Sequence, residues 1–243
     1  MLLAWILGFS LLGSLGAVGG AALLLAFPDE VRQRLVPALI AYAAGTLLGA
    51  AFLGMIPAAA GNAPVRAVSA TVLAGIVLFF LLERLVLWRH GHEAGGSSNP
   101  AAPLILVGDA FHNFVDGVVI AAAFLTSVPL GVAAGLAVAA HEVPQEVGDF
   151  AILLDGGYSR RKALALNALS STATLPGALA GYFWLADVQG VVPYVLALSA
   201  SSFIYIAVAD LLPGLHRRPS GGWRQLALLL AGIGTIAVFH FHR

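Results

Sequence analysis

The sequence predicts an all-α polytopic membrane protein with eight transmembrane helices. Of its 243 residues, 60% are hydrophobic and only 10% are charged, a balance typical of chains whose solvent is lipid. The apolar residues fall into runs of about 20, the length that a helix needs to cross a hydrocarbon core of roughly 30 Å. Short polar stretches separate the runs, so we interpret residues 1–243 as one transmembrane domain.

Each apolar run predicts one helix. The expected helices cover residues 2–26, 36–59, 67–89, 102–125, 129–154, 163–185, 190–214 and 223–242. The longest polar stretch, 89–103, contains His90, His92 and then several Gly, Ser and Pro residues, which is typical of a flexible linker. The link from Thr126 to Pro129 is short, so we expect the fourth and fifth helices to be antiparallel neighbours.

Positive charge is distributed unevenly between the loops. One alternating set of loops carries most of the basic residues, namely Arg32, Arg34, Arg84, Arg89, Arg160, Arg161, Lys162, Arg217, Arg218 and Arg224. The other set has Arg66 and Arg243. Because basic loops tend to stay in the cytoplasm, both termini are expected to be extracytoplasmic. We therefore expect a multi-pass protein of the cell membrane, either an inner or a plasma membrane.

The composition also limits which binding partners and metal ligands the chain can have. The net charge is zero and the basic residues form no patch, which argues against a nucleic-acid partner and leaves the lipid bilayer as the surrounding medium. The chain has no cysteine, so nitrogen and oxygen must hold any metal ion. Glycines four apart, as in Gly45–Gly49 and Gly131–Gly135, allow close helix approach. We interpret them as packing within the bundle and leave a homodimer open.

The fourth expected helix carries ionisable residues in its interior. Asp109, His112 and Asp116 are three and four residues apart, which places them on one face of a helix, and Asn113 lies beside His112. Ionisable groups inside a membrane segment are expensive and mark functional sites. This polar face is therefore expected to handle something charged.

The fifth expected helix repeats the pattern. His141 and Gln145 are four residues apart, and so are Glu142 and Glu146. Pro144 lies among them, and a proline inside a helix kinks it and frees a backbone oxygen. Imidazole nitrogen with carboxylate and amide oxygen is a ligand set for zinc, iron, manganese or cadmium. Two such rows on neighbouring helices favour a metal site over a simple hydrogen-bond network.

Two alternatives use the same residues. The order His141-Glu142-x-x-Gln145 partly matches the His-Glu-x-x-His pattern of zinc proteases, in which the glutamate activates water. An intramembrane metal-dependent hydrolase with Glu142 as general base is one alternative. Glutamine replaces the second histidine, however, so we expect that the chain is not an enzyme. The other alternative is a metal sensor that does not transport.

At these residues the sequence resembles the ZIP (Zrt/Irt-like) family of divalent metal transporters. Residues 112–117 are similar to the family's His-Asn-x-x-Asp/Glu-Gly signature, and residues 141–149 to its His-Glu-x-Pro-x-Glu-x-Gly-Asp form. Residues 43–57 and 203–213 are similar to its second and seventh helices. The resemblance implies a ZIP-like bundle of eight helices with both termini outside. It also implies transport of a divalent metal ion towards the cytoplasm by alternating access, with zinc as the leading candidate substrate.

The resemblance also implies a metal site of one or two ions midway across the membrane. Its main position would use His112, Asp116, His141 and Gln145, and its second position would use Asn113, Asp116, Glu142 and Gln145. Gln145 departs from the family pattern, since many members have Glu or His there.

Further polar residues are candidates for the pathway. Asp109 is expected on the approach or exit path, and Glu146 and Asp149 are expected to be structural or to handle protons. Asp210 and His216 lie near the cytoplasmic end of the seventh expected helix. Asp210 is a candidate exit ligand, and an ion pair with a basic loop residue is the alternative.

Overall fold

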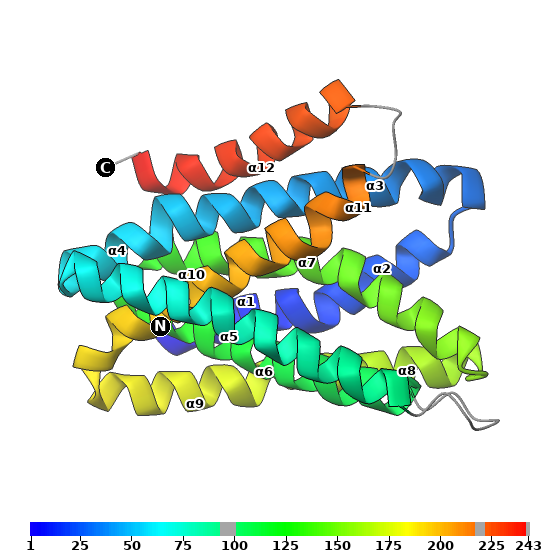
Figure 1. Ribbon diagram of the computed structural model, residues 1–243, viewed down its shortest axis with the longest axis horizontal. Helices are drawn as coiled ribbons and strands as arrows, with labels where there is room; N and C mark the ends of the chain where they lie inside the picture. The colour runs from blue at the N-terminus through cyan, green and yellow to red at the C-terminus, as the bar shows by residue number, and fades with distance from the viewer. Residues whose placement is uncertain (93–100, 217–221, 242–243) are drawn as a thin grey trace.

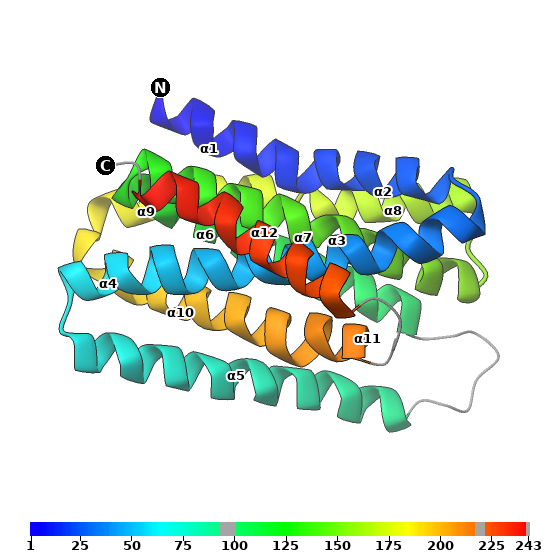
Figure 2. The same ribbon diagram turned by 90° about the horizontal axis from the view of Figure 1, so that it is seen from above.

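The computed structural model describes residues 1–92, 101–216 and 222–241, and every regular element in these ranges is a helix. The helical runs lie side by side along the long axis of the molecule, as both views show (Figures 1 and 2). The prediction of an all-α protein is confirmed.

The helices follow the expected order along the chain. The first part contains α1 (Leu2–Leu11), η1 (Leu12–Gly16), α2 (Ala17–Leu25), α3 (Asp29–Gly49), η2 (Ala50–Met55), α4 (Ile56–Asn62) and α5 (Val65–His92). The second part contains α6 (Ala101–Thr126), α7 (Val128–Asp155), α8 (Arg160–Ser171), α9 (Thr174–Asp187), η3 (Gln189–Val191), α10 (Val192–Tyr205), η4 (Ile206–Leu211), α11 (Leu212–His216) and α12 (Gly222–Phe241). The segments η1, η2 and η4 are π-helical turns inside longer helical runs.

Two helices differ from their expected ranges. The second run begins at Asp29 instead of residue 36, because Asp29 and Glu30 in its first turn suit the positive end of a helix dipole although they are not apolar. The sixth run is broken at residues 172–173, between α8 and α9. Near this break the hydroxyls of Ser170 and Thr172 donate to backbone carbonyls three residues earlier. Such local bonds compete with the regular helix.

The linker expected over 89–103 is shorter in the structure. Helix α5 continues to His92 and α6 begins at Ala101, while residues 93–100 lie outside the described ranges. The structure describes the backbone of His90 and His92 as helical.

Length and composition make several of these runs able to cross a membrane. Five described segments satisfy both conditions: Leu2–Leu25, Asp29–Asn62, Val65–Leu82, Leu106–Thr126 and Val192–Ala209. Helix α7 has 28 residues but carries buried acids, and α8 and α9 are short because of the break. The chain is therefore a multi-pass membrane protein.

Helix α6 packs against α7 and α9. Glycines allow the approach to α9, since a Cβ on Gly117 would overlap the carbonyl of Thr174 and one on Gly177 would overlap that of Phe114. Gly45 makes an equally close contact between α3 and α12. These glycines serve packing within one chain.

The two ends of the bundle differ in charge. The start of α1 and the end of α12 lie at the same end of the molecule (Figures 1 and 2). The opposite end holds the starts of α3, α8 and α12 and the end of α5, with Arg32, Arg160, Arg161, Lys162 and Arg224 near those starts. We call this opposite end the basic end. The expected placement of both termini outside and the basic end in the cytoplasm fits this arrangement.

Candidate metal centre

Helices α6 and α7 form an antiparallel pair joined through Ser127. The Ser127 hydroxyl accepts a hydrogen bond from the Leu130 N–H at 3.3 Å and so caps the first turn of α7. Pro129 lies in that same turn, where its missing N–H costs no helical hydrogen bond. Because the link is so short, the polar faces of the two helices lie opposite each other.

Four side chains converge between these helices: His112 and Asp116 from α6 with His141 and Glu142 from α7. We call them the first group. The His112 Nε2 atom lies 3.4 Å from Glu142 Oε1 and 3.7 Å from Asp116 Oδ2. The His141 Nε2 atom lies 3.3 Å from Asp116 Oδ2 and 3.4 Å from Glu142 Oε1, and the two Nε2 atoms are 3.2 Å apart.

These separations suit a shared metal ion. Tetrahedral ligands at zinc–ligand distances of about 2.0–2.2 Å lie about 3.3–3.6 Å from one another. The five distances above fall near this range, and the four ligand atoms all lie within 4.8 Å of one another. The first group therefore offers two imidazole nitrogens and two carboxylate oxygens to one point.

His141 is held in position on both sides of its ring. Its Nδ1 atom lies 3.0 Å from the Ala137 carbonyl oxygen, which leaves Nε2 facing the carboxylates. The edge of the ring packs against Phe203, with ring centroids 5.9 Å apart. His112 is the accessible member of the group, because its side chain is 22% exposed while those of the other three are exposed by 1% or less.

Electrostatics favour a cation here. Asp116 and Glu142 are buried, and none of their four carboxylate oxygens has a hydrogen-bond partner among the described residues. Burying a charge without compensation costs several kcal/mol, on the order of the stability of a whole domain. Two ionised carboxylates beside two neutral imidazoles carry a charge of −2, which one divalent cation would neutralise.

A second cluster adjoins the first and shares one residue with it. Asp109, Glu142 and Glu146, which we call the second group, bring three carboxylate oxygens within 4.8 Å of one another. All three residues are exposed by 5% or less. Asp109 precedes His112 by three residues and Glu146 follows Glu142 by four. Because α6 and α7 are antiparallel, both steps lead towards the basic end.

Two of the six expected metal residues point to Asp109 instead of the first group. Asn113 Nδ2 donates to Asp109 Oδ1 at 3.0 Å, and Gln145 Nε2 donates to the same oxygen at 3.1 Å. The Thr174 hydroxyl donates to Asn113 Oδ1 at 2.8 Å, so both ends of that amide are occupied. These two amides turn to Asp109 because an ionised carboxylate oxygen attracts amide donors strongly.

Thr174 was missed by sequence reasoning, because it begins α9 after the break and so falls outside the periodicity of the sixth helix. The hydroxyl-rich run at residues 170–174 was the available signal. Asn167, one turn before the break, donates to the Glu146 carbonyl at 3.1 Å and ties α8 to α7.

Three pathway candidates remain, Asp149, Asp210 and His216. Asp149 is on α7, three residues after Glu146. Asp210 lies in η4 and His216 ends α11, and the side chains of these two are outside the described part of the structure.

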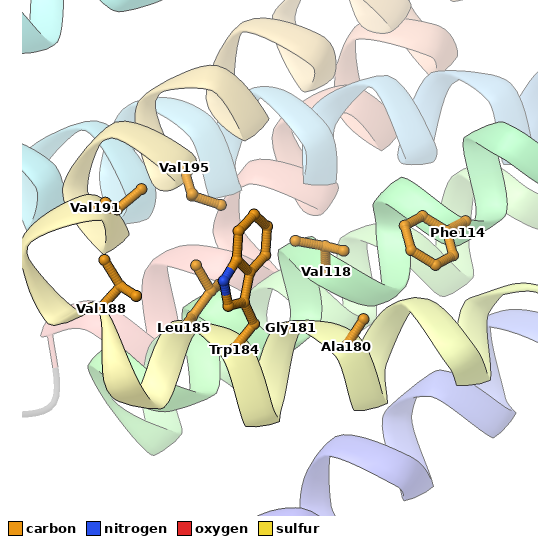
Figure 3. Close-up of a pocket in the computed structure, with 9 residues that line it drawn as sticks. All are labelled: Phe114, Val118, Ala180, Gly181, Trp184, Leu185, Val188, Val191 and Val195. Carbon is orange, nitrogen blue, oxygen red and sulfur yellow. The ribbon is translucent and has the colours of Figure 1, made fainter.

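A separate cavity of about 180 Å³ lies between α6, α9 and the start of α10 (Figure 3). Its lining includes Phe114, Val118 and Trp184, and none of the residues that line it carries a carboxylate, imidazole or amide side chain. It therefore offers no carboxylate, imidazole or amide ligand to a metal ion.

A multi-pass helical bundle with two histidines and two buried carboxylates between two helices defines a membrane protein that binds metal. The family model described as ZIP zinc transporter matches residues 89–240, and the chain belongs to this family. This confirms the resemblance. Since the family is one of zinc transporters, the chain is assigned to transporters and the hydrolase alternative is set aside.

Individual relatives agree with the assignment. Zinc transporter ZIP13 of Pongo abelii is 34% identical over an alignment of 258 positions that covers 95% of this chain and 77% of the relative. Zinc transporter zipt-7.2 of Caenorhabditis elegans is 31% identical over an alignment that covers 76% of this chain and 54% of the relative. Human zinc transporter ZIP4 is 39% identical over 138 residues, which cover 55% of this chain and 20% of the relative. The chain thus spans only part of these longer relatives.

Proposed function

We propose that the chain carries divalent transition-metal ions across a cell membrane towards the cytoplasm, with zinc as the leading candidate substrate. The observation that supports this most is the first group, in which two imidazoles and two unpartnered buried carboxylates converge. Iron, manganese and cadmium are the other candidate substrates, since the same donors bind them.

The proposed site uses all six residues singled out from the sequence. His112, Asp116, His141 and Glu142 bind the ion directly in this arrangement. Asn113 and Gln145 act through their hydrogen bonds to Asp109. The ion loses its water to these ligands and reaches them past His112, which is the most accessible member of the group.

Transport requires that the site open to one side at a time. We propose alternating access, in which α6 and α7 move relative to the rest of the bundle. The proposed topology has eight transmembrane segments with both termini outside and the basic end in the cytoplasm. A homodimer stays open, and the glycines four apart do not bear on it because they make contacts within the chain.

Zinc uptake into proteoliposomes tests the proposal. Wild type should take up zinc, and His112→Ala and His141→Ala should each reduce the rate at least about tenfold, because even outer partners of metal ligands are worth about 10–100-fold. His240→Ala, in α12, is the matched control and should transport like wild type.

Two results would contradict the proposal. Uptake that is unchanged in both histidine variants would remove the first group from the pathway. Tight binding of zinc without flux in any vesicle preparation would favour the alternative of a non-transporting metal sensor.

A further inference from the structure

Glu146 is a buried acid that takes no part in the first group. Its side chain is 1% exposed, and neither of its carboxylate oxygens has a hydrogen-bond partner among the described residues. The neighbouring acid Asp109 differs, because its Oδ1 atom accepts hydrogen bonds from two amides. Hydrogen bonds of this kind offset the cost of burying a charge. The charge of Glu146 is therefore less compensated than that of Asp109.

Helix α8 places two further polar side chains beside Glu146. Asn167 and Ser171 are four residues apart on one face of α8, which packs against α7. The Asn167 amide nitrogen donates to the Glu146 backbone carbonyl at 3.1 Å, and the Ser171 hydroxyl lies near the Glu146 carboxylate. Both side chains are exposed by 2% or less.

The oxygen atoms of these two side chains are also unpartnered. Within the described part of the chain, neither Asn167 Oδ1 nor Ser171 Oγ is within hydrogen-bond geometry of another polar group. Buried polar oxygens normally have a partner, and each one without a partner needs an explanation. Three adjoining residues on α7 and α8 thus offer a carboxylate, an amide oxygen and a hydroxyl oxygen that no other residue uses.

The backbone next to these side chains also favours a cation. Helix α8 ends at Ser171, and α9 begins at Thr174 after the break in the sixth run. The carbonyl end of a helix carries partial negative charge. In membrane transporters, the carbonyl ends of helices broken in this way are places where coupling cations such as sodium bind. The break therefore adds negative potential beside Glu146.

The donor set determines which ion suits it. One carboxylate with two neutral oxygens is balanced by a single positive charge, and all three donors are hard oxygens without the imidazole that favours zinc. We propose that Glu146, Asn167 and Ser171 form a binding site for a sodium ion between α7 and α8. The site goes beyond the proposed zinc function, because it uses neither histidine of the first group.

Thermal unfolding of the purified full-length protein tests the proposal. The Tm is measured in detergent with a metal chelator, in sodium chloride, potassium chloride and N-methylglucamine chloride at equal ionic strength. Sodium should raise the wild-type Tm above both other salts, because an ion that binds the folded protein stabilises it. Glu146→Gln should lose this difference. Glu30→Gln, at an exposed position of α3, is the matched control and should keep it.

A second variant removes a neutral ligand and keeps the charge. Ser171→Ala should raise the sodium concentration that gives half of the full stabilisation by about fivefold, since one hydroxyl contact is lost. Ser199→Ala removes a buried hydroxyl on α10 and should respond to sodium like wild type.

Radioactive sodium provides a direct count. Equilibrium dialysis should find one sodium ion per chain in wild type and none in Glu146→Gln. Equal Tm values in sodium and potassium, or sodium binding that is unchanged in Glu146→Gln and Ser171→Ala, would overturn the proposal. The proposed transport function fails separately, if zinc flux does not depend on His112 and His141.

Discussion

Single residues determine how the candidate site attracts a cation. Asp116 and Glu142 are buried between α6 and α7 without hydrogen-bond partners, and His112 and His141 direct their Nε2 atoms at them. Each carboxylate is costly to bury alone, so the bound ion should contribute much of the local stability.

Replacing Asp116 by asparagine should weaken zinc uptake by at least about tenfold, because a charged ligand becomes a neutral one. The measurement is the initial rate of uptake over a range of zinc concentrations. Asp187→Asn, at the exposed end of α9, is the matched control. Equal rates for Asp116→Asn and wild type would exclude this carboxylate as a ligand.

Acidification should inhibit uptake. Protonation removes the Nε2 lone pair that each imidazole offers to the metal, and protonated carboxylates bind it poorly. The rate should therefore fall as the pH is lowered from neutral to mildly acidic, when it is measured in vesicles with a clamped membrane potential. A rate that stays constant over this range would contradict ligation by His112 and His141.

Thr174 is expected to position the site without touching the ion. Thr174→Val removes the hydroxyl that donates to Asn113 and so loosens the contact of Asn113 with Asp109. One hydrogen bond is worth about 1 kcal/mol, so the KM for zinc should rise about fivefold. Thr174→Ser, which keeps the hydroxyl, should restore the KM. A purely structural residue would lower the Tm of Thr174→Val and leave its KM unchanged.

The sequence predicted four residues that the structure brings together, because His112, Asp116, His141 and Glu142 lie at helical spacing on adjacent antiparallel helices. It could not predict which side chains bond to which. The amides of Asn113 and Gln145 have no ligand preference readable from spacing, and their turn towards Asp109 depends on the packing of α6 and α7.

At the level of elements, close helix contacts hold the site. Helix α6 contacts both α7 and α9, and the α6–α9 contact depends on Gly117 and Gly177. The break between α8 and α9 brings Thr174 to Asn113. Apolar patterning predicted one continuous sixth helix, since the hydroxyl-rich break hardly changes the mean hydropathy of that segment.

Adding a methyl group at the α6–α9 contact should destabilise the protein. In Gly177→Ala the new Cβ would overlap the Phe114 carbonyl, so the helices must separate at a cost of about 1–3 kcal/mol. Gly61→Ala in α4, where a Cβ meets open space, should change stability by about 1 kcal/mol or less. The measurement is thermal unfolding in detergent, and equal Tm values for the two variants would contradict the close contact.

At the scale of the whole molecule, the distribution of charge bears on the proposed direction of transport. The basic end lies opposite the two termini, and the second group lies on the basic side of the first. An ion moving from the first to the second group would therefore move towards the cytoplasm in the proposed orientation.

Labelling can test that orientation, because the native chain has no cysteine. Pro64→Cys lies at the end of the bundle that holds the termini, and Ala26→Cys lies at the basic end; both positions are exposed. In intact cells a membrane-impermeant thiol reagent should label Pro64→Cys and should reach Ala26→Cys only after lysis. The reverse result would invert the topology.

The position of the bound ion is the most direct test of the metal centre. Crystals of the protein grown with zinc should show an anomalous peak within about 2.0–2.2 Å of Nε2 of both His112 and His141. Asp116 and Glu142 should complete the ligand shell. A protein that transports zinc but shows its intramembrane peak away from these four residues would contradict the account.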